Sequence, residues 1–233
     1  ADKIEYKKSP QENGISYTAF GNVVIKDSSK IAKCEIATYL IDNEMTILSV
    51  NPSIEDSEQI LTGEKIILTY QDETLKEIKI PKNAKALTKI YGYRNSKIDS
   101  ISDLDTLVLE NSITGSSLNS SFKNGKLNSI RIRGMARTLY HVFEDSIYKG
   151  KNKASGDSMI MTFSENILDH IEVYGGSEGQ YIPDSISNDI KSKINYSSDK
   201  ITYMLNTRVT NFKGNTDIQF EDTNLKAGYV SVN

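Results

Sequence analysis

The feature of the sequence that most constrains the fold is an alternation of apolar and polar residues that recurs at five places. Each instance follows a small residue, and these starting points are Cys34, Gly63, Gly115, Gly156 and Ser198. Of the 15 residues that lie three, five and seven positions after them, 14 are apolar and Ser120 is the exception. A period of two is typical of a strand with one buried face. Each starting point is therefore expected to open a strand.

A second alternating segment follows each of these strands after three or four mostly polar residues. Connections this short between alternating strands are typical of β-hairpins. The sequence thus predicts repeat units near 34–50, 63–80, 115–132, 156–173 and 198–214, with a further unit that starts at 227. Because the last unit has little room before Asn233, we expect the natural protein to continue beyond this fragment.

The composition also favours strands. The chain has 29 Ile against 15 Leu and 9 Ala, and β-branched side chains suit strands whereas Ala and Leu suit helices. Two insertions, near 91–111 and 136–153, interrupt the repeat. The second can be read as a short helix or a strand pair, and we favour strands. Residues 183–195 are expected to form a surface loop, and residues 1–233 a single elongated domain.

Charge and cysteine content exclude several classes of protein. The net charge is −3, which gives no bulk reason to expect nucleic acid as a partner. A single cysteine cannot staple a disulfide-rich scaffold. There is no run of 18 apolar residues that would predict a spanning helix. The start of the chain is not a signal peptide, and we expect that one was removed before Ala1.

The sequence contains little that indicates a catalytic site. His141 and His170 are the only histidines, and neither has the spacing of a metal site. No serine lies in a GxSxG motif. Gly175, Gly176 and Gly179 lack the Lys-Ser/Thr of a phosphate loop, so they are expected to turn or bulge a strand. We therefore expect no catalytic residue, no metal and no cofactor.

Several segments resemble the OstA/LptA-like family of lipopolysaccharide-transport proteins, which includes the periplasmic N-terminal part of LptD-like outer-membrane assembly proteins. The resemblance is carried by TAFGNVVI (18–25), ASGDSMIMTF (154–163), IEVYGGSEGQYIP (171–183), residues 194–220 and LKAGYVSVN (225–233). It covers most of the chain and is clearest after Ile113. The two insertions fit an LptD-like fragment better than a complete LptA-like bridge.

The resemblance implies an antiparallel β-jellyroll, a folded-over double sheet that opens like a V. Its interior would shield the acyl chains of lipopolysaccharide or a similar multi-acyl lipid, in the periplasm or at the periplasmic face of the outer membrane. The implied partners are other jellyroll transport domains joined by edge-strand addition, with head-to-tail self-association as one form. The expected groove residues are Ile66, Leu68, Tyr70, Ile78, Ile80, Leu118, Phe122, Ile130, Ile132, Met159, Met161, Phe163, Ile171, Val173, Ile201, Tyr203 and Leu205.

Two of these interpretations have plainer alternatives. The alternating apolar residues could fill the closed core of a structural or adhesion module instead of a groove. In favour of the groove, adaptable side chains such as Met159 and Met161 suit a lipid. Each methylene of an acyl chain that is buried there contributes about 0.8 kcal/mol to binding. Arg131 and Arg133 share the polar face of one strand, where they could bind anionic groups or simply face water.

Overall fold

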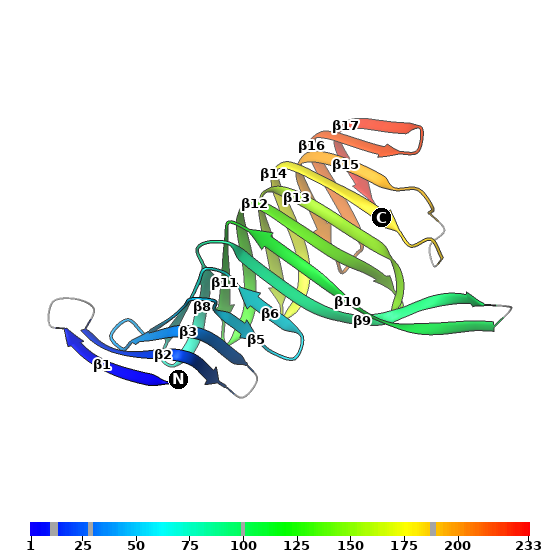
Figure 1. Ribbon diagram of the computed structural model, residues 1–233. Helices are drawn as coiled ribbons and strands as arrows, with labels where there is room; N and C mark the ends of the chain where they lie inside the picture. The colour runs from blue at the N-terminus through cyan, green and yellow to red at the C-terminus, as the bar shows by residue number, and fades with distance from the viewer. Residues whose placement is uncertain (10–13, 28–29, 99–100, 187–189) are drawn as a thin grey trace. The chain divides into compact units, whose positions relative to one another are not determined.

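The computed structural model describes residues 1–9, 14–27, 30–98, 101–186 and 190–233. These residues form 17 strands of one largely antiparallel sheet and contain no helix, so the all-β prediction is confirmed (Figure 1). The strands divide between two compact units. Unit 1 comprises Ala1–Ala86, Thr114–Gly134 and Ile160–Asp169, and unit 2 comprises Leu87–Ile113, Met135–Met159 and His170–Asn233. The expectation of a single elongated domain stays a prediction.

The strand bounds are as follows. The first eight are β1 (Lys3–Ser9), β2 (Gly14–Lys26), β3 (Ile31–Leu40), β4 (Met45–Ser49), β5 (Ser53–Glu55), β6 (Gln59–Thr62), β7 (Lys65–Gln71) and β8 (Thr74–Ile80). The remaining nine are β9 (Ala84–Ile98), β10 (Ile101–Gly115), β11 (Ser117–Lys123), β12 (Lys126–Glu144), β13 (Ile147–Ser164), β14 (Ile167–Pro183), β15 (Ile194–Met204), β16 (Val209–Phe220) and β17 (Thr223–Val232). Antiparallel pairs occupy four of the predicted hairpins, β3–β4, β7–β8, β11–β12 and β15–β16, and the neighbouring strands β13 and β14 occupy the place near 156–173.

In unit 1 the buried aliphatic residues form rows across neighbouring strands. Leu118 of β11 lies opposite Ile80 of β8 on one side and Ile132 of β12 on the other. Leu48 of β4 lies opposite both Ala37 of β3 and Ile66 of β7. Directly opposed apolar side chains are the unit of sheet stabilisation. The alternation read from the sequence thus becomes one continuous apolar face.

The long strands are interrupted midway by β-bulges. In β2, Gly21 and Asn22 face the single residue Glu35 of β3, and both have positive φ. In β14, Gly175 and Gly176 likewise have positive φ and stand opposite Asp199 of β15. A bulge bends its strand and increases the local twist. The expectation that Gly175 and Gly176 bulge a strand is confirmed.

The side-chain geometry of β15 shows how sharp such a bend is. Tyr196 and Tyr203 are seven residues apart, yet their hydroxyl oxygens lie 2.9 Å from each other. In a straight strand the two Cα atoms would be about 23 Å apart, which is farther than two tyrosine side chains can span. Buried residues also change phase between Ser198 and Ile201. The strand therefore folds back on itself, and both tyrosines point inward.

The starting points of the sequence repeat lie at these bends, and their small size has a steric cause. A Cβ atom on Gly63 would lie 2.2 Å from Cγ2 of Ile80, and one on Gly115 would lie 2.4 Å from Cγ2 of Ile132. In unit 2 a Cβ on Gly156 would lie 2.7 Å from Cγ1 of Val173. Real Cβ atoms do not approach carbon this closely, so only glycine fits where the strand crosses a branched side chain.

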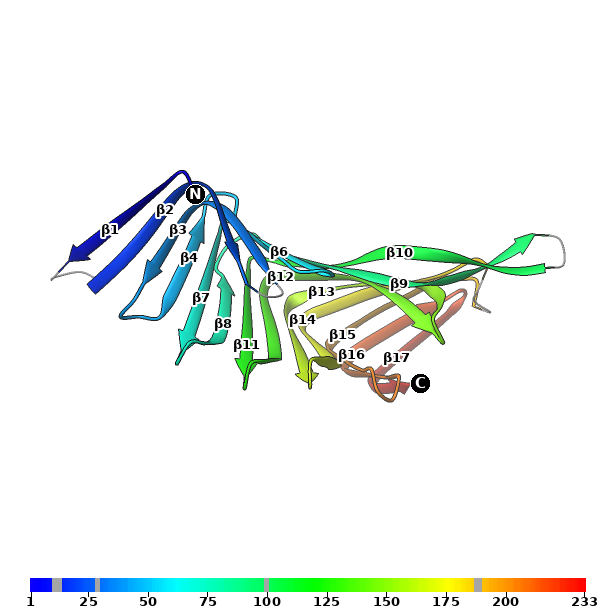
Figure 2. The same ribbon diagram turned by 90° about the horizontal axis from the view of Figure 1, so that it is seen from below.

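The two insertions also form strands. The strand interpretation of 136–153 is confirmed, because this segment contributes to β12 and β13. The insertion at 91–111 falls within β9 and β10, which run side by side as a long ribbon (Figures 1 and 2). The expected loop at 183–195 overlaps both neighbouring strands, because Pro183 ends β14 and Ile194 and Asn195 begin β15. Its residues 187–189 fall outside the described part of the chain.

Two adjacent glycines allow a test of the bend in unit 2. A Cβ on Gly175 would lie 2.3 Å from Oδ2 of Asp157, whereas one on Gly176 would meet nothing within 4 Å. Both have positive φ, so alanine costs about 1 kcal/mol of backbone strain at either site. We expect Gly175→Ala to lower the free energy of unfolding in urea clearly more than Gly176→Ala. Equal losses would show that the approach of Asp157 does not constrain the bend.

Candidate functional site

We call the face of the hairpins that carries the apolar rows the inner face. In unit 1, burial on this face changes along each strand. On β7, Ile66 next to the bend is fully buried, while Leu68 and Tyr70 nearer the turn are half-buried. On β8, Ile80 is fully buried at the bend and Leu75 is half-buried near the turn. Packing is therefore complete beside the bends, and apolar surface remains accessible toward the turns.

The same order recurs in the other hairpins. In unit 1, Leu118 is buried and Phe122 half-buried on β11. On β15 of unit 2, Ile201 is fully buried, and Leu205 in the following turn is half-buried. Residues that the sequence places on one face thus divide by their distance from the bend. Only the part of that face near the turns could contact a ligand.

This gradient sorts the expected groove residues into two sets. The buried set is Ile66, Ile78, Ile80, Leu118, Ile132 and Met161 in unit 1, and Met159, Ile171, Val173 and Ile201 in unit 2. The half-buried set is Leu68, Tyr70, Phe122, Ile130 and Phe163 in unit 1, and Tyr203 and Leu205 in unit 2. The buried set forms core, and the half-buried set is the candidate binding surface.

An open depression of about 340 Å³ lies at the hairpin ends of unit 1. Leu127 and Phe163 supply its apolar part, and its polar residues are Lys123, Asn124, Lys126, Asn128, Ser164 and Glu165. The two hairpin ends are tied together by an ion pair between Lys126 and Glu165. The backbone N–H of Leu127 also donates to Oδ1 of Asn166 at 2.8 Å. The lining is mostly polar, and Leu127 and Phe163 add an apolar portion to it.

Sequence reasoning missed the part of the inner face that lies on the other side of the bends. This part includes buried residues such as Ile54 and Ala84 in unit 1, and Ala136, Ala154 and Tyr196 in unit 2. Many are alanines, which give a weak periodic signal. Extending the alternation two residues back from Gly156 and Ser198 would have found Ala154 and Tyr196.

Arg131 and Arg133 lie on the outer face of β12. Both are exposed and alternate with the fully buried Ile132. Arg131 stands opposite Asn119 of β11, whose side-chain amide donates to Oε1 of Glu77 at 2.6 Å. This surface is polar and faces away from the apolar residues. A role of the two arginines in binding anions stays a prediction.

The histidines occupy different surroundings. Asn111 Oδ1 accepts a hydrogen bond from the backbone N–H of His141 at 2.8 Å, and the Nδ1 of His141 lies 3.1 Å from the same oxygen. Burial, together with the charge of Lys151, lowers the pKa of His141, so its ring is neutral at physiological pH. His170 lies on β14, with its Nε2 3.9 Å from Oε2 of Glu172.

Metal ligands do not gather in the part of the chain that the structure describes. In it, no group of three or more His, Cys, Asp or Glu side chains is arranged to hold an ion. Nor does any helix long and apolar enough to cross a membrane occur among the described residues. The expectation that the chain is not an enzyme stays a prediction.

Comparison with known proteins gives no assignment. No model of a known protein family matches the chain, and a search of curated proteins finds no matching relative. The function must therefore be argued from the geometry of the inner face.

Two residues of β7 test the division between core and binding surface. Ile66 is fully buried and Leu68, on the same face two residues later, is half-buried. We expect Ile66→Ala to lower the free energy of unfolding by about 2–5 kcal/mol, because it leaves a cavity in packed core. Leu68→Ala should cost less than about 2 kcal/mol, since that side chain is partly hydrated already. Urea denaturation measures both, and equal costs would contradict the division.

Proposed function

We propose that this chain is a non-enzymatic lipid-binding and transport domain of the periplasm. In this proposal its inner face shields the acyl chains of lipopolysaccharide, or of a similar multi-acyl lipid, on the way to the outer membrane. The observation that carries the proposal is the burial gradient. Side chains that share one apolar face are fully buried at the bends and half-buried toward the turns.

Half-buried apolar side chains supply the driving force for binding. Leu68, Tyr70, Phe122 and Phe163 of unit 1 keep part of their surface in water. Covering them with an alkyl chain removes apolar surface from water on both partners, and each methylene transferred is worth about 0.8 kcal/mol. A ligand with several chains therefore binds well without any catalytic group. The sugars and phosphates of such a lipid would stay outside in water.

The bends support a β-jellyroll in which the sheet folds over like a V. Bulges at Gly21–Asn22 and Gly175–Gly176 bend the strands, and the hydroxyl contact within β15 requires that strand to fold back. This is the architecture that the resemblance to OstA/LptA-like proteins implies. We extend the proposal to an LptD-like domain, because both insertions add strands to the sheet.

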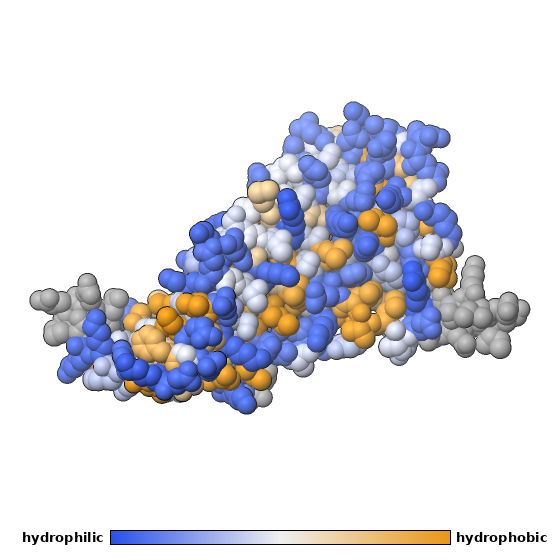
Figure 3. Space-filling model, viewed as in Figure 1, coloured by the Kyte–Doolittle hydropathy of each residue, from blue (hydrophilic) through white to orange (hydrophobic). Residues whose placement is uncertain are grey.

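The strands at the two ends of the chain suit partners of the same kind. β1 pairs with β2, and β17 pairs with β16. Ile4 of β1 and Val24 and Ile25 of β2 are exposed, and hydrophobic surface gathers over these N-terminal strands (Figure 3). We propose that other jellyroll transport domains, including copies of this chain head to tail, add strands at such edges.

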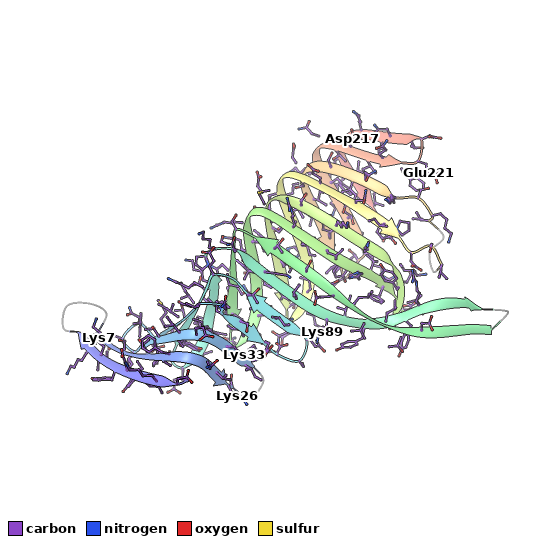
Figure 4. All side chains as sticks on the ribbon, in the orientation of Figure 1. Lys7, Lys26, Lys33, Lys89, Asp217 and Glu221 are labelled. Carbon is purple, nitrogen blue, oxygen red and sulfur yellow. The ribbon has the colours of Figure 1, made fainter. Side chains whose placement is uncertain are left out.

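Lysines on the same N-terminal strands would restrict that pairing. Lys7 and Lys26 are exposed and project from β1 and β2, whereas Lys33 of the neighbouring β3 is paired with Glu55 (Figure 4). Lysine on or near an edge disfavours indiscriminate strand addition, because a partner must accommodate the charge. In this proposal the edge at β1 therefore accepts strands that place acidic side chains or water next to these lysines.

Photocrosslinking from β13 tests the lipid-binding face. Phe163 contributes to the apolar part of the depression, whereas Thr162 points to the other face of the same strand. With a photoreactive phenylalanine analogue at position 163, we expect crosslinks to purified lipopolysaccharide. The same probe at position 162 should give none. Crosslinked lipid is detected as a shifted band on a denaturing gel.

A pair of charged variants provides an independent readout. Phe163→Asp should weaken lipopolysaccharide binding about tenfold or more, because an aromatic contact worth about 1.5–3 kcal/mol is lost. Thr162→Asp should leave binding unchanged. Both variants are expected to stay folded, as judged by urea denaturation. Absence of crosslinks at both positions in folded protein, or equal crosslinking at both, would sink the proposal and favour a closed structural or adhesion module.

A further inference from the structure

The inner face of unit 2 holds a polar cluster made of Asn152, Tyr196 and Tyr203. The Tyr196 hydroxyl donates to Oδ1 of Asn152. The Tyr203 hydroxyl oxygen lies 2.9 Å from that of Tyr196. Because the single proton of Tyr196 is committed to Asn152, Tyr203 is the donor in the second bond. The cluster therefore joins β13 to both halves of the folded β15.

The cluster is held rigidly by its neighbours. Tyr196 is 7% exposed, and its ring lies over Gly179, where a Cβ would come within 2.2 Å of the ring atoms. Phe212 packs edge-on against the same ring, with 5.4 Å between centroids. This explains Gly179, which makes room for an aromatic ring rather than bulging the strand. A polar group fixed in this way is preorganised for a ligand.

Hydrogen-bonding capacity remains on the accessible side. Asn152 and Tyr203 are half-buried whereas Tyr196 is buried. The Asn152 amide has two N–H groups, of which one can serve Tyr203, and the Tyr203 oxygen keeps a lone pair. One donor and one acceptor are thus left side by side. A hydroxyl group, which accepts and donates at once, matches this pair.

The cluster is also neutral. Burial, with the nearby Tyr196 hydroxyl, raises the pKa of Tyr203 well above its ordinary value, so the phenol keeps its proton. On β15 the nearest cation, Lys200, is on the opposite face from Ile201 and pairs with Oε1 of Glu172 at 2.5 Å. Lys200 of β15 is therefore not available to the cluster as a charge partner. The chemistry favours an uncharged polar group.

We propose that Asn152, Tyr196 and Tyr203 form a subsite for a hydroxyl group carried on an alkyl chain of the bound amphiphile. This inference rests on the proposed lipid-binding function and adds chain selectivity to it. A hydroxyl buried against purely apolar side chains loses its hydrogen bonds to water. At this cluster it regains them, so hydroxylated chains are preferred over plain ones.

Matched fatty acids test the subsite. Dodecanoic acid and 3-hydroxydodecanoic acid are titrated against the full chain loaded with a fluorescent apolar dye, and displacement gives both affinities. We expect the hydroxylated acid to bind about tenfold more tightly than the plain acid. Tyr203→Phe should reduce this ratio to near one, because the ring stays in place and only the hydroxyl that bonds the ligand is lost. Urea denaturation of Tyr203→Phe shows independently whether the variant is folded.

The control is Tyr174→Phe, the same change on the outer face of β14, where the Lys200 Nζ lies 4.7 Å from the ring centroid. It should keep the wild-type ratio. A wild-type ratio near one, or an unchanged ratio in Tyr203→Phe, overturns the subsite while lipopolysaccharide crosslinks at position 163 leave the proposed function standing. If wild-type protein binds neither acid and gives no crosslinks, the proposed function fails and the subsite with it.

Discussion

The close approach of neighbouring strands at the bends is the constraint on which the rest of the structure depends. Glycine at 63, 115 and 156 lets a strand pass directly over a branched side chain of the next strand. The residue that follows the starting point then donates its backbone N–H across the bend, as Glu35 does to Val50 at 3.1 Å and Ser116 to Gly134 at 2.8 Å. Repetition of this contact aligns the bends, and aligned bends keep the apolar residues on one face.

In the proposed function that face serves two purposes, stability and binding, whose requirements differ. Beside the bends, Ile66 and Met159 are fully buried and contribute stability through dense packing. Toward the turns, Leu68 and Phe163 keep apolar surface in water, which is unfavourable unless something covers it. A chain that needed only stability would gain by closing these ends. The half-buried positions are therefore the feature that best distinguishes a binding protein from a purely structural module.

The sequence could predict which residues face inward but not how deeply they lie. Period-two alternation placed Met161 and Phe163 on one face, and both do point inward, but only the distance from the bend makes Met161 core and leaves Phe163 accessible. Gly175 and Gly176 were identifiable as a bulge. Gly179 was not, because the reason for it is the ring of Tyr196 on the neighbouring strand. The predicted function, partners and location remain predictions, since they depend on ligands rather than on the fold.

The side-chain contacts that seal the bends are local in sequence, and this bears on how the chain acquires its structure. In each case an asparagine side-chain amide donates a hydrogen bond to a carboxylate. The pairs are Asn22 with Asp2, 20 residues apart, Asn83 with Glu64, 19 apart, and Asn215 with Asp199, 16 apart. Closing loops of this length costs only modest entropy, because the cost grows with the logarithm of loop length. A bend can therefore close as soon as its own two strands are available. A polypeptide delivered end first through a narrow channel could fold progressively, without waiting for its last residue.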